Sequence, residues 1–167
     1  PMVPALQALA VALAGASGGA QEAASGRSSR LYRALVATGL ATEVEAGAGL
    51  NKDPYLFSIE ATLRPEGDHR AVESRILEEL ARIASEPMVA EEFTRVRKQV
   101  LAANAFPSDT VTGRAFRLGQ LLSTGAASSI GEWYERLAAV TADDVRAAAA
   151  ATFVERSRSV GHFEPTE

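Results

Sequence analysis

The sequence contains no cysteine and only two histidines among its 167 residues. Without cysteine there is no disulfide framework, no thiolate zinc site and no cysteine nucleophile. The two histidines, His69 and His162, lie far apart in the sequence. The zinc motif of helical hydrolases needs two histidines about four positions apart, with a glutamate beside one of them. The chain therefore does not supply this zinc motif by itself.

Charge and hydropathy exclude two further classes. The net charge of -4 at pH 7 is opposite in sign to that of the basic surfaces that bind nucleic acids. The apolar residues 1–14 lack a basic start and are too short to span a membrane, so they predict a buried helix rather than a membrane segment. The proline at position 1, where an initiator methionine would stand, predicts a piece of a longer protein. The length predicts a single domain over residues 1–167.

Polar and apolar residues alternate in two segments, 42–46 and 57–63, which is typical of strands with one buried face. A loop around Asn51–Pro54 separates them, so we expect an antiparallel pair with one solvent-exposed face. A turn is predicted at 64–68. A third strand is predicted at 157–163.

Alanine, with 33 occurrences, has the highest helix propensity, and most other segments show helical spacing of apolar residues. Helices are predicted at 5–14 and from a cap at Ser28 or Ser29 to Gly39. Five more are expected, with caps at Asp109, Ser129 and Thr141 for the last three. Their apolar stripes are Val72, Ile76, Leu80 and Ile83; Phe93, Val96, Val100 and Leu101; Val111, Ala115, Leu118 and Leu122; Ile130, Trp133 and Leu137; and Val145, Ala149 and Phe153.

The predicted fold class is α+β, an antiparallel sheet covered by helices. Three strands are few for so many helices, so we expect further strands to precede residue 1 or to come from another chain.

The candidates for chemistry each have a simpler structural interpretation. His69 follows a turn and is expected on the surface, and His162 is expected in a structural strand position. Glu78-Glu79 and Glu91-Glu92 are expected to be solvated, because neighbouring side chains on a helix point about 100° apart. Ser28-Ser29 lacks the sequence context of a serine nucleophile, and the Gly15–Gly26 loop lacks the lysine of a phosphate-binding loop. Trp133 is expected in the core.

Six motifs follow one another along nearly the whole chain. They are Ser28-Ser29-Arg30-Leu31-Tyr32 with Gly39-Leu40-Ala41; Asp53-Pro54 before Leu56-Phe57; Glu91-Glu92-Phe93 with Arg95 to Arg97; Gly113-Arg114-Ala115 with Leu118-Gly119; Val140-Thr141-Ala142-Asp143-Asp144-Val145; and Val160-Gly161 with Phe163 and Pro165. In this order and spacing they resemble the insulinase/pitrilysin-type zinc metallopeptidases, with Phe93 and Arg97 as mild departures.

The resemblance implies a metallopeptidase half-domain. Members of that family pair two homologous α+β domains around a closed chamber, and only one of the two binds zinc. This chain resembles the other, inactive domain without its first strands. The resemblance therefore implies part of a bacterial zinc metalloendopeptidase, with no metal ligand or catalytic residue in this segment. Zinc is expected in a homologous partner domain of the same chain or another subunit, with a peptide as substrate. Two-domain bacterial members are often exported, which points to the periplasm.

In some members the inactive half donates an arginine and a tyrosine toward the substrate carbonyl. The resemblance places Val36 and Thr42 at these positions, and neither side chain replaces a charged or phenolic donor. The first hypothesis is thus a non-catalytic domain that closes the chamber and helps to bind an extended peptide. The alternatives are an assembly scaffold without a role in proteolysis and an unrelated helical interaction domain.

Overall fold

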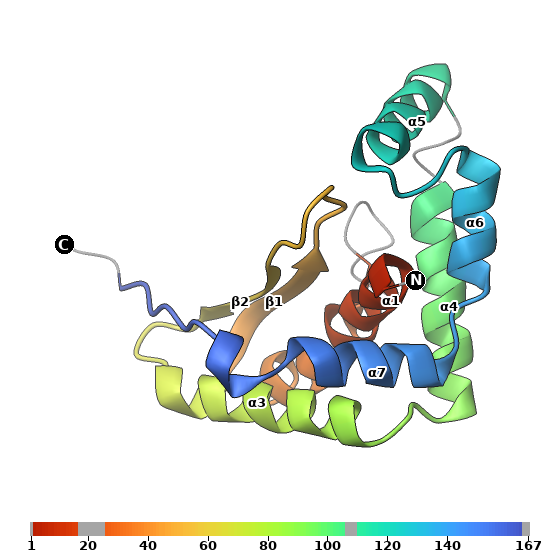
Figure 1. The fold of residues 1–167 in the computed structure, drawn as a ribbon. Helices are drawn as coiled ribbons and strands as arrows, with labels where there is room; N and C mark the ends of the chain where they lie inside the picture. The colour runs from red at the N-terminus through yellow and green to blue at the C-terminus, as the bar shows by residue number, and fades with distance from the viewer. Residues whose placement is uncertain (1, 17–25, 106–109, 165–167) are drawn as a thin grey trace.

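The computed structural model describes residues 2–16, 26–105 and 110–164 (Figure 1). Its longer elements are α1 (Met2–Ala14), β1 (Ala41–Ala48), β2 (Phe57–Leu63), α3 (His69–Ser85), α4 (Ala90–Ala105), α5 (Val111–Thr124), α6 (Ile130–Ala138) and α7 (Ala142–Thr152). A π-helical turn, η1 (Tyr32–Val36), precedes β1, and a 3₁₀ turn, η3 (Glu155–Ser157), follows α7. No helix within these ranges is both long enough and apolar enough to cross a bilayer.

Strands β1 and β2 form an antiparallel pair, as the alternation of polar and apolar residues predicts. Every second side chain of β2, beginning with Phe57, is half-buried, and the residues between them are exposed. The inner face of β1 carries the buried Ala41, Val44 and Ala46. The sheet therefore has one face against the core and one face toward solvent. The presence of a sheet also rules out the alternative of a purely helical domain.

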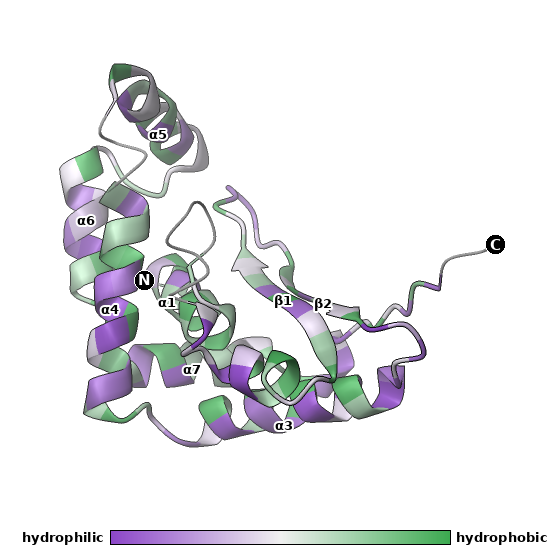
Figure 2. Cartoon of the chain, turned by 180° about the vertical axis from the view of Figure 1, so that it is seen from behind, coloured by the Kyte–Doolittle hydropathy of each residue, from purple (hydrophilic) through white to green (hydrophobic). Residues whose placement is uncertain are grey.

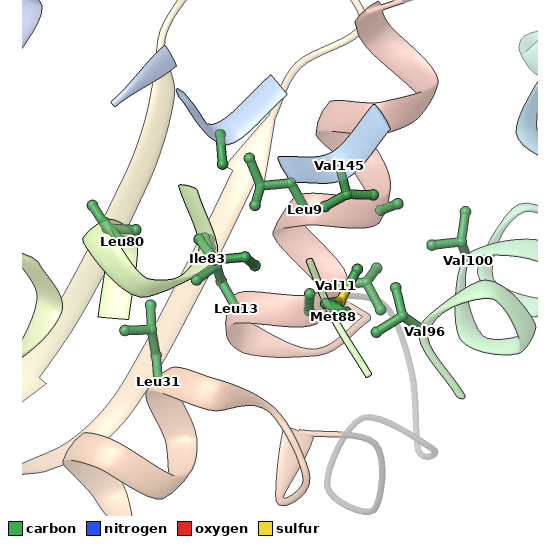
Figure 3. Close-up of a cluster of buried hydrophobic side chains, with 14 of the residues drawn as sticks. Leu9, Val11, Leu13, Leu31, Leu80, Ile83, Met88, Val96, Val100 and Val145 are labelled. Atoms are coloured by element: carbon green, nitrogen blue, oxygen red, sulfur yellow. The ribbon is translucent and has the colours of Figure 1, made fainter. Parts of the chain in front are cut away.

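Helix α1 lies between the hairpin and the other helices (Figure 1). It contacts β1 on one side and α4 and α7 on others, and Leu9 and Leu13 are completely buried. Figure 3 shows Leu9 near Val145 of α7, and Leu13 near Ile83 of α3. A helix that is apolar on all sides must be enclosed by other elements. The sequence-based prediction of a buried first helix is confirmed.

Side-chain caps and glycines fix the helix ends. The Asp68 carboxylate accepts hydrogen bonds from the backbone of Arg70 and Ala71 at the start of α3. At α7, Thr141 and Asp144 form the reciprocal capping box that their spacing predicts. Gly39 has a φ of 80°, a left-handed conformation that favours glycine, and it ends the turn before β1.

Three details of the predicted helices are different in the structure. The Ser29 hydroxyl donates to the Gly26 carbonyl instead of capping a helix. Ser129 caps α6, but the Glu132 carboxylate accepts from Ser128 rather than closing a box on Ser129. Thr110 caps α5, and Asp109 lies outside the described residues, as does most of the Gly15–Gly26 loop.

One larger prediction is wrong. Residues 157–163 form no strand; after η3 the described chain pairs with neither β1 nor β2. The apolar stripe of α5 does not enter the core, since Val111, Leu118 and Leu122 are exposed and only the adjacent Leu121 is buried. The periodicity identified α5 as an amphipathic helix but did not show which side faces the protein body.

The exposed sheet face contains an unfavourable charge pair that can be tested. Glu45 and Glu60 are direct cross-strand partners, and like charges in this position destabilise a sheet. We expect Glu60→Lys to raise the free energy of unfolding by about 0.5 kcal/mol, because a lysine would attract Glu45. Urea unfolding at low salt measures the change. Glu43→Lys is the control, because Glu43 lies opposite the uncharged Thr62 and should change stability less.

Candidate functional site

The solvent-facing side of the hairpin is the most exposed polar surface of the sheet. Glu43 and Glu45 of β1 and Ser58 and Glu60 of β2 are exposed there. A shallow hollow of about 140 Å³ lies between Glu45, Ala46 and Gly47 on one strand and Ser58 and Glu60 on the other. The small Gly47 and Ser58 stand opposite each other in the register and leave this part of the face open.

Both strands have an edge that pairs with no other strand in the described part of the chain. Strand β1 contacts helix α1 as well as β2. Among the described elements, the main neighbour of β2 is β1 alone. An unpaired strand edge presents backbone N–H and C=O groups that can pair with an extended peptide. Within the described part of the chain, the hairpin therefore combines an unpaired strand edge with an open polar face beside it.

A buried ion pair holds the segment that leads into this hairpin. Arg30 donates from Nε to Glu92 Oε1 and from Nη2 to Glu92 Oε2, both at 2.8 Å. Each side chain is only 11% exposed. Arg95 adds a hydrogen bond to the backbone carbonyl of Ser28 at 3.3 Å. These contacts join the Ser28–Tyr32 motif to the Glu91–Phe93 motif across 62 residues.

The electrostatics of this pair favour the charged forms of both partners. Burial alone would raise the pKa of Glu92. The hydrogen bond and charge of Arg30, with the charges of Arg95 and Arg33, outweigh this effect and lower that pKa. The hydrogen bond to Glu92 raises the pKa of Arg30 against its own desolvation, and nearby Glu79 adds to the effect. Two-point geometry of this kind fixes orientation as well as distance.

The prediction that Glu79 and Glu92 are solvated is wrong, because both are buried. Glu79 pairs with Arg82 at 3.0 Å. The sequence did contain a signal: Glu92 is four residues before Val96 and thus on the buried stripe of α4. Glu79 likewise lies four residues before the buried Ile83. A glutamate in phase with an apolar stripe indicates a buried partner of opposite charge.

The two histidines meet in space although they are far apart in sequence. The rings of His69 and His162 stack with centroids 4.9 Å apart and an angle of 18° between their planes. Glu73 Oε2 lies 3.6 Å from Nε2 of His162. No three histidine or carboxylate side chains within 2–16, 26–105 and 110–164 are grouped so that they could hold a metal ion. The described residues therefore do not fit a zinc site, and His162 is not in the strand that was predicted.

The remaining candidates have structural roles. Val36 packs against the core cluster, and the Thr42 hydroxyl donates to the Thr62 carbonyl at 3.0 Å. Trp133 is buried as predicted, and its Nε1 donates to Asn104 Oδ1 at 3.1 Å. Sequence spacing did not single out Asn104, a buried residue of α4 whose Oδ1 also accepts from Arg117 of α5.

Comparisons with known proteins give consistent matches. The family model described as the peptidase M16 inactive domain matches residues 3–100, more than half of the chain. The structure of a candidate zinc protease from Bordetella pertussis Tohama I is similar with a TM-score of 0.82 and 28% identity, covering 99% of this chain and 86% of that chain. The inactive peptidase domain of a candidate zinc protease from Bordetella parapertussis is similar with a TM-score of 0.79 and 27% identity, covering 100% of this chain and 84% of that chain. A search of curated proteins gave no match.

The buried ion pair predicts a large stability effect. Glu92→Gln leaves the buried Arg30 without a counter-charge, and we expect it to lower the free energy of unfolding by about 3 kcal/mol at pH 7. Glu91→Gln is the matched control, because Glu91 is the exposed neighbour on the same turn and should change stability by less than about 0.5 kcal/mol. Chemical denaturation measures both, and equal effects of the two changes would contradict the buried role of Glu92.

The same pair predicts a pH dependence. The pKa of Glu92 is lowered in the folded state, so its contribution to stability is complete above the unfolded value of about 4.3. This contribution is lost as the pH falls through the lower folded pKa. The stability difference between the wild type and Glu92→Gln should therefore be constant near neutral pH and shrink below about pH 4. A difference that grows on acidification would contradict this assignment.

Proposed function

The chain belongs to the inactive-domain family of the insulinase-type (M16) zinc peptidases, and on this premise we propose that it binds an extended peptide and closes the chamber for its zinc-bearing partner domain. An inactive domain of a zinc protease implies a catalytic partner domain. The observation that carries the proposal is the β1–β2 hairpin, whose edges pair with no further strand in the described residues and whose outer face is open and polar. Backbone pairing at such an edge would hold a peptide largely independently of its sequence.

The structure supports a binding surface that is held rigidly from behind. The inner face of the hairpin packs on α1, and the segment entering β1 is tied to α4 by Arg30 and Glu92. A strand edge fixed in this way loses little conformational entropy when a peptide is added to it. The described residues offer no metal-binding group, so the chemical step would belong to the partner domain.

A second candidate function is an assembly scaffold that takes no part in proteolysis. It is favoured by Val36 and Thr42, which stand where some family members donate an arginine and a tyrosine toward the substrate. Val36 packs into the core and Thr42 bonds to the opposite strand, so neither is free to take over that task. The two functions differ in one measurable respect, because only the first requires contact with the peptide.

Methylation of alternate backbone amides in a bound peptide distinguishes the two functions by its effect on affinity. We expect the complete protein, with this domain and its zinc-bearing partner, to bind a labelled extended peptide. Methylating the edge-facing amides should weaken binding at least tenfold, since each lost hydrogen bond costs about 1 kcal/mol. Fluorescence anisotropy with the metal removed measures affinity without cleavage.

The peptide methylated on the other alternate amides is the control and should bind nearly as well as the unmethylated peptide. The affinity of the zinc-bearing domain alone for the same peptides is measured as well. Its contribution can then be subtracted. Identical affinities with and without this chain would contradict peptide binding and favour the scaffold.

A further inference from the structure

Helix α5 exposes the side that a surface helix normally buries. Its apolar stripe consists of Val111, Ala115, Leu118 and Leu122, at the spacing of one helix face. Val111 is 87% exposed, Leu122 is 55% exposed and Leu118 is 37% exposed. Figures 1 and 2 show α5 at the periphery, beyond the ends of α4 and α6.

Another side of α5 attaches it to the domain, through Arg117 and the buried Leu121. Arg117 donates from Nη2 to Asn104 Oδ1 of α4 at 3.1 Å, and its Nη1 donates to Gln120 Oε1 within α5 itself at 3.3 Å. Leu121 is the only completely buried apolar side chain among the residues of α5. Since successive side chains on a helix are about 100° apart, Arg117 and Leu121 point well away from the stripe. The helix is thus held by the side that carries Arg117 and Leu121, and no element among the described residues covers its apolar stripe.

We propose that the α5 stripe is the docking surface for the zinc-bearing partner domain. The inference rests on the proposed function, because it presumes that such a partner is present. The partner would supply a shallow apolar surface for the two leucines and Val111. It would thereby cover the part of this domain for which the chain itself has no covering element among the described residues.

The exposed area favours a partner that is already held nearby over a second copy of the chain. Covering the stripe would remove on the order of 300 Å² from water. A stable complex of free proteins buries about 800 Å² per partner. Two copies meeting through α5 alone therefore fall short, whereas a partner domain held by a linker or by other contacts needs less area.

The charge of α5 gives an independent reason against self-pairing. The helix contains Arg114 and Arg117 and no acidic residue, although the whole chain has a net charge of -4. Arg114 lies beside Leu118 on the helix surface, one turn earlier. Two α5 helices packed stripe to stripe would bring the two copies of Arg114 toward the same seam. A partner surface with carboxylates around an apolar centre would match this helix better.

The absence of cysteine allows a direct test in the assembled protein. Leu118→Cys and, as a second probe, Leu122→Cys place a single thiol on the stripe, and Ser123→Cys places one on the exposed flank as the matched control. The partner domain is used with any cysteines of its own replaced. We expect the stripe thiols to react with a maleimide at least tenfold more slowly than the control thiol. A photo-crosslinker attached at residue 118 should join the zinc-bearing domain.

Each other outcome overturns the proposal. Equal reactivity of stripe and control thiols would show an uncovered surface. Protection that disappears on dilution, with cross-links between copies, would identify self-association. Cross-links confined to the chain itself would show that α5 turns its stripe onto its own domain. Peptide affinity of the same variants reports separately on the proposed function, so that function can survive the failure of this docking surface.

Discussion

The arrangement of the domain depends on the need to enclose α1 from every side. This helix has no polar face, so water must be excluded around its whole circumference. Strand β1, α4 and α7 are its main neighbours, and together they account for the layers that Figure 1 shows around it. The hairpin is held against the helices because its inner residues form one of the walls around Leu9 and Leu13. The position of the proposed peptide-binding edge thus follows from the packing of a helix that is distant from any substrate.

A second constraint links the same layers by charge. Arg30 and Glu92 come from two motifs that are far apart in sequence, and they meet where water is largely excluded. Burying such a pair gains little net stability, but a partner left alone is costly. The two-point pairing of Arg30 with Glu92 instead sets the orientation in which the segment entering β1 meets α4. For the proposed binding of a peptide by its backbone, a fixed strand position would matter more than added stability.

The sequence predicted the parts of the fold that depend on local periodicity. The limits of β2, the capping box at Thr141 and the buried first helix all follow from the spacing of residues within one element. What could not be predicted depends on contacts between distant segments. The stacking of His69 on His162 is of this kind, and so is the failure of residues 157–163 to form a strand. The candidate site was only partly predictable, because the resemblance gave the class of domain but not its exposed edge or its buried ion pair.

Helices α1 and α5 show that the spacing of apolar residues identifies an apolar helix face but not the surface that covers it. Both helices are rich in apolar residues, yet one is enclosed and the other turns its stripe to solvent. The hydrophobic effect acts on area removed from water and does not distinguish a surface of the same chain from that of another protein. Arg117 and Asn104 help to hold α5 with its stripe outward, so turning the stripe inward would break this half-buried hydrogen bond. An amphipathic helix held in this orientation gains its apolar burial only from outside the domain. The proposed docking of the zinc-bearing partner domain would supply that burial.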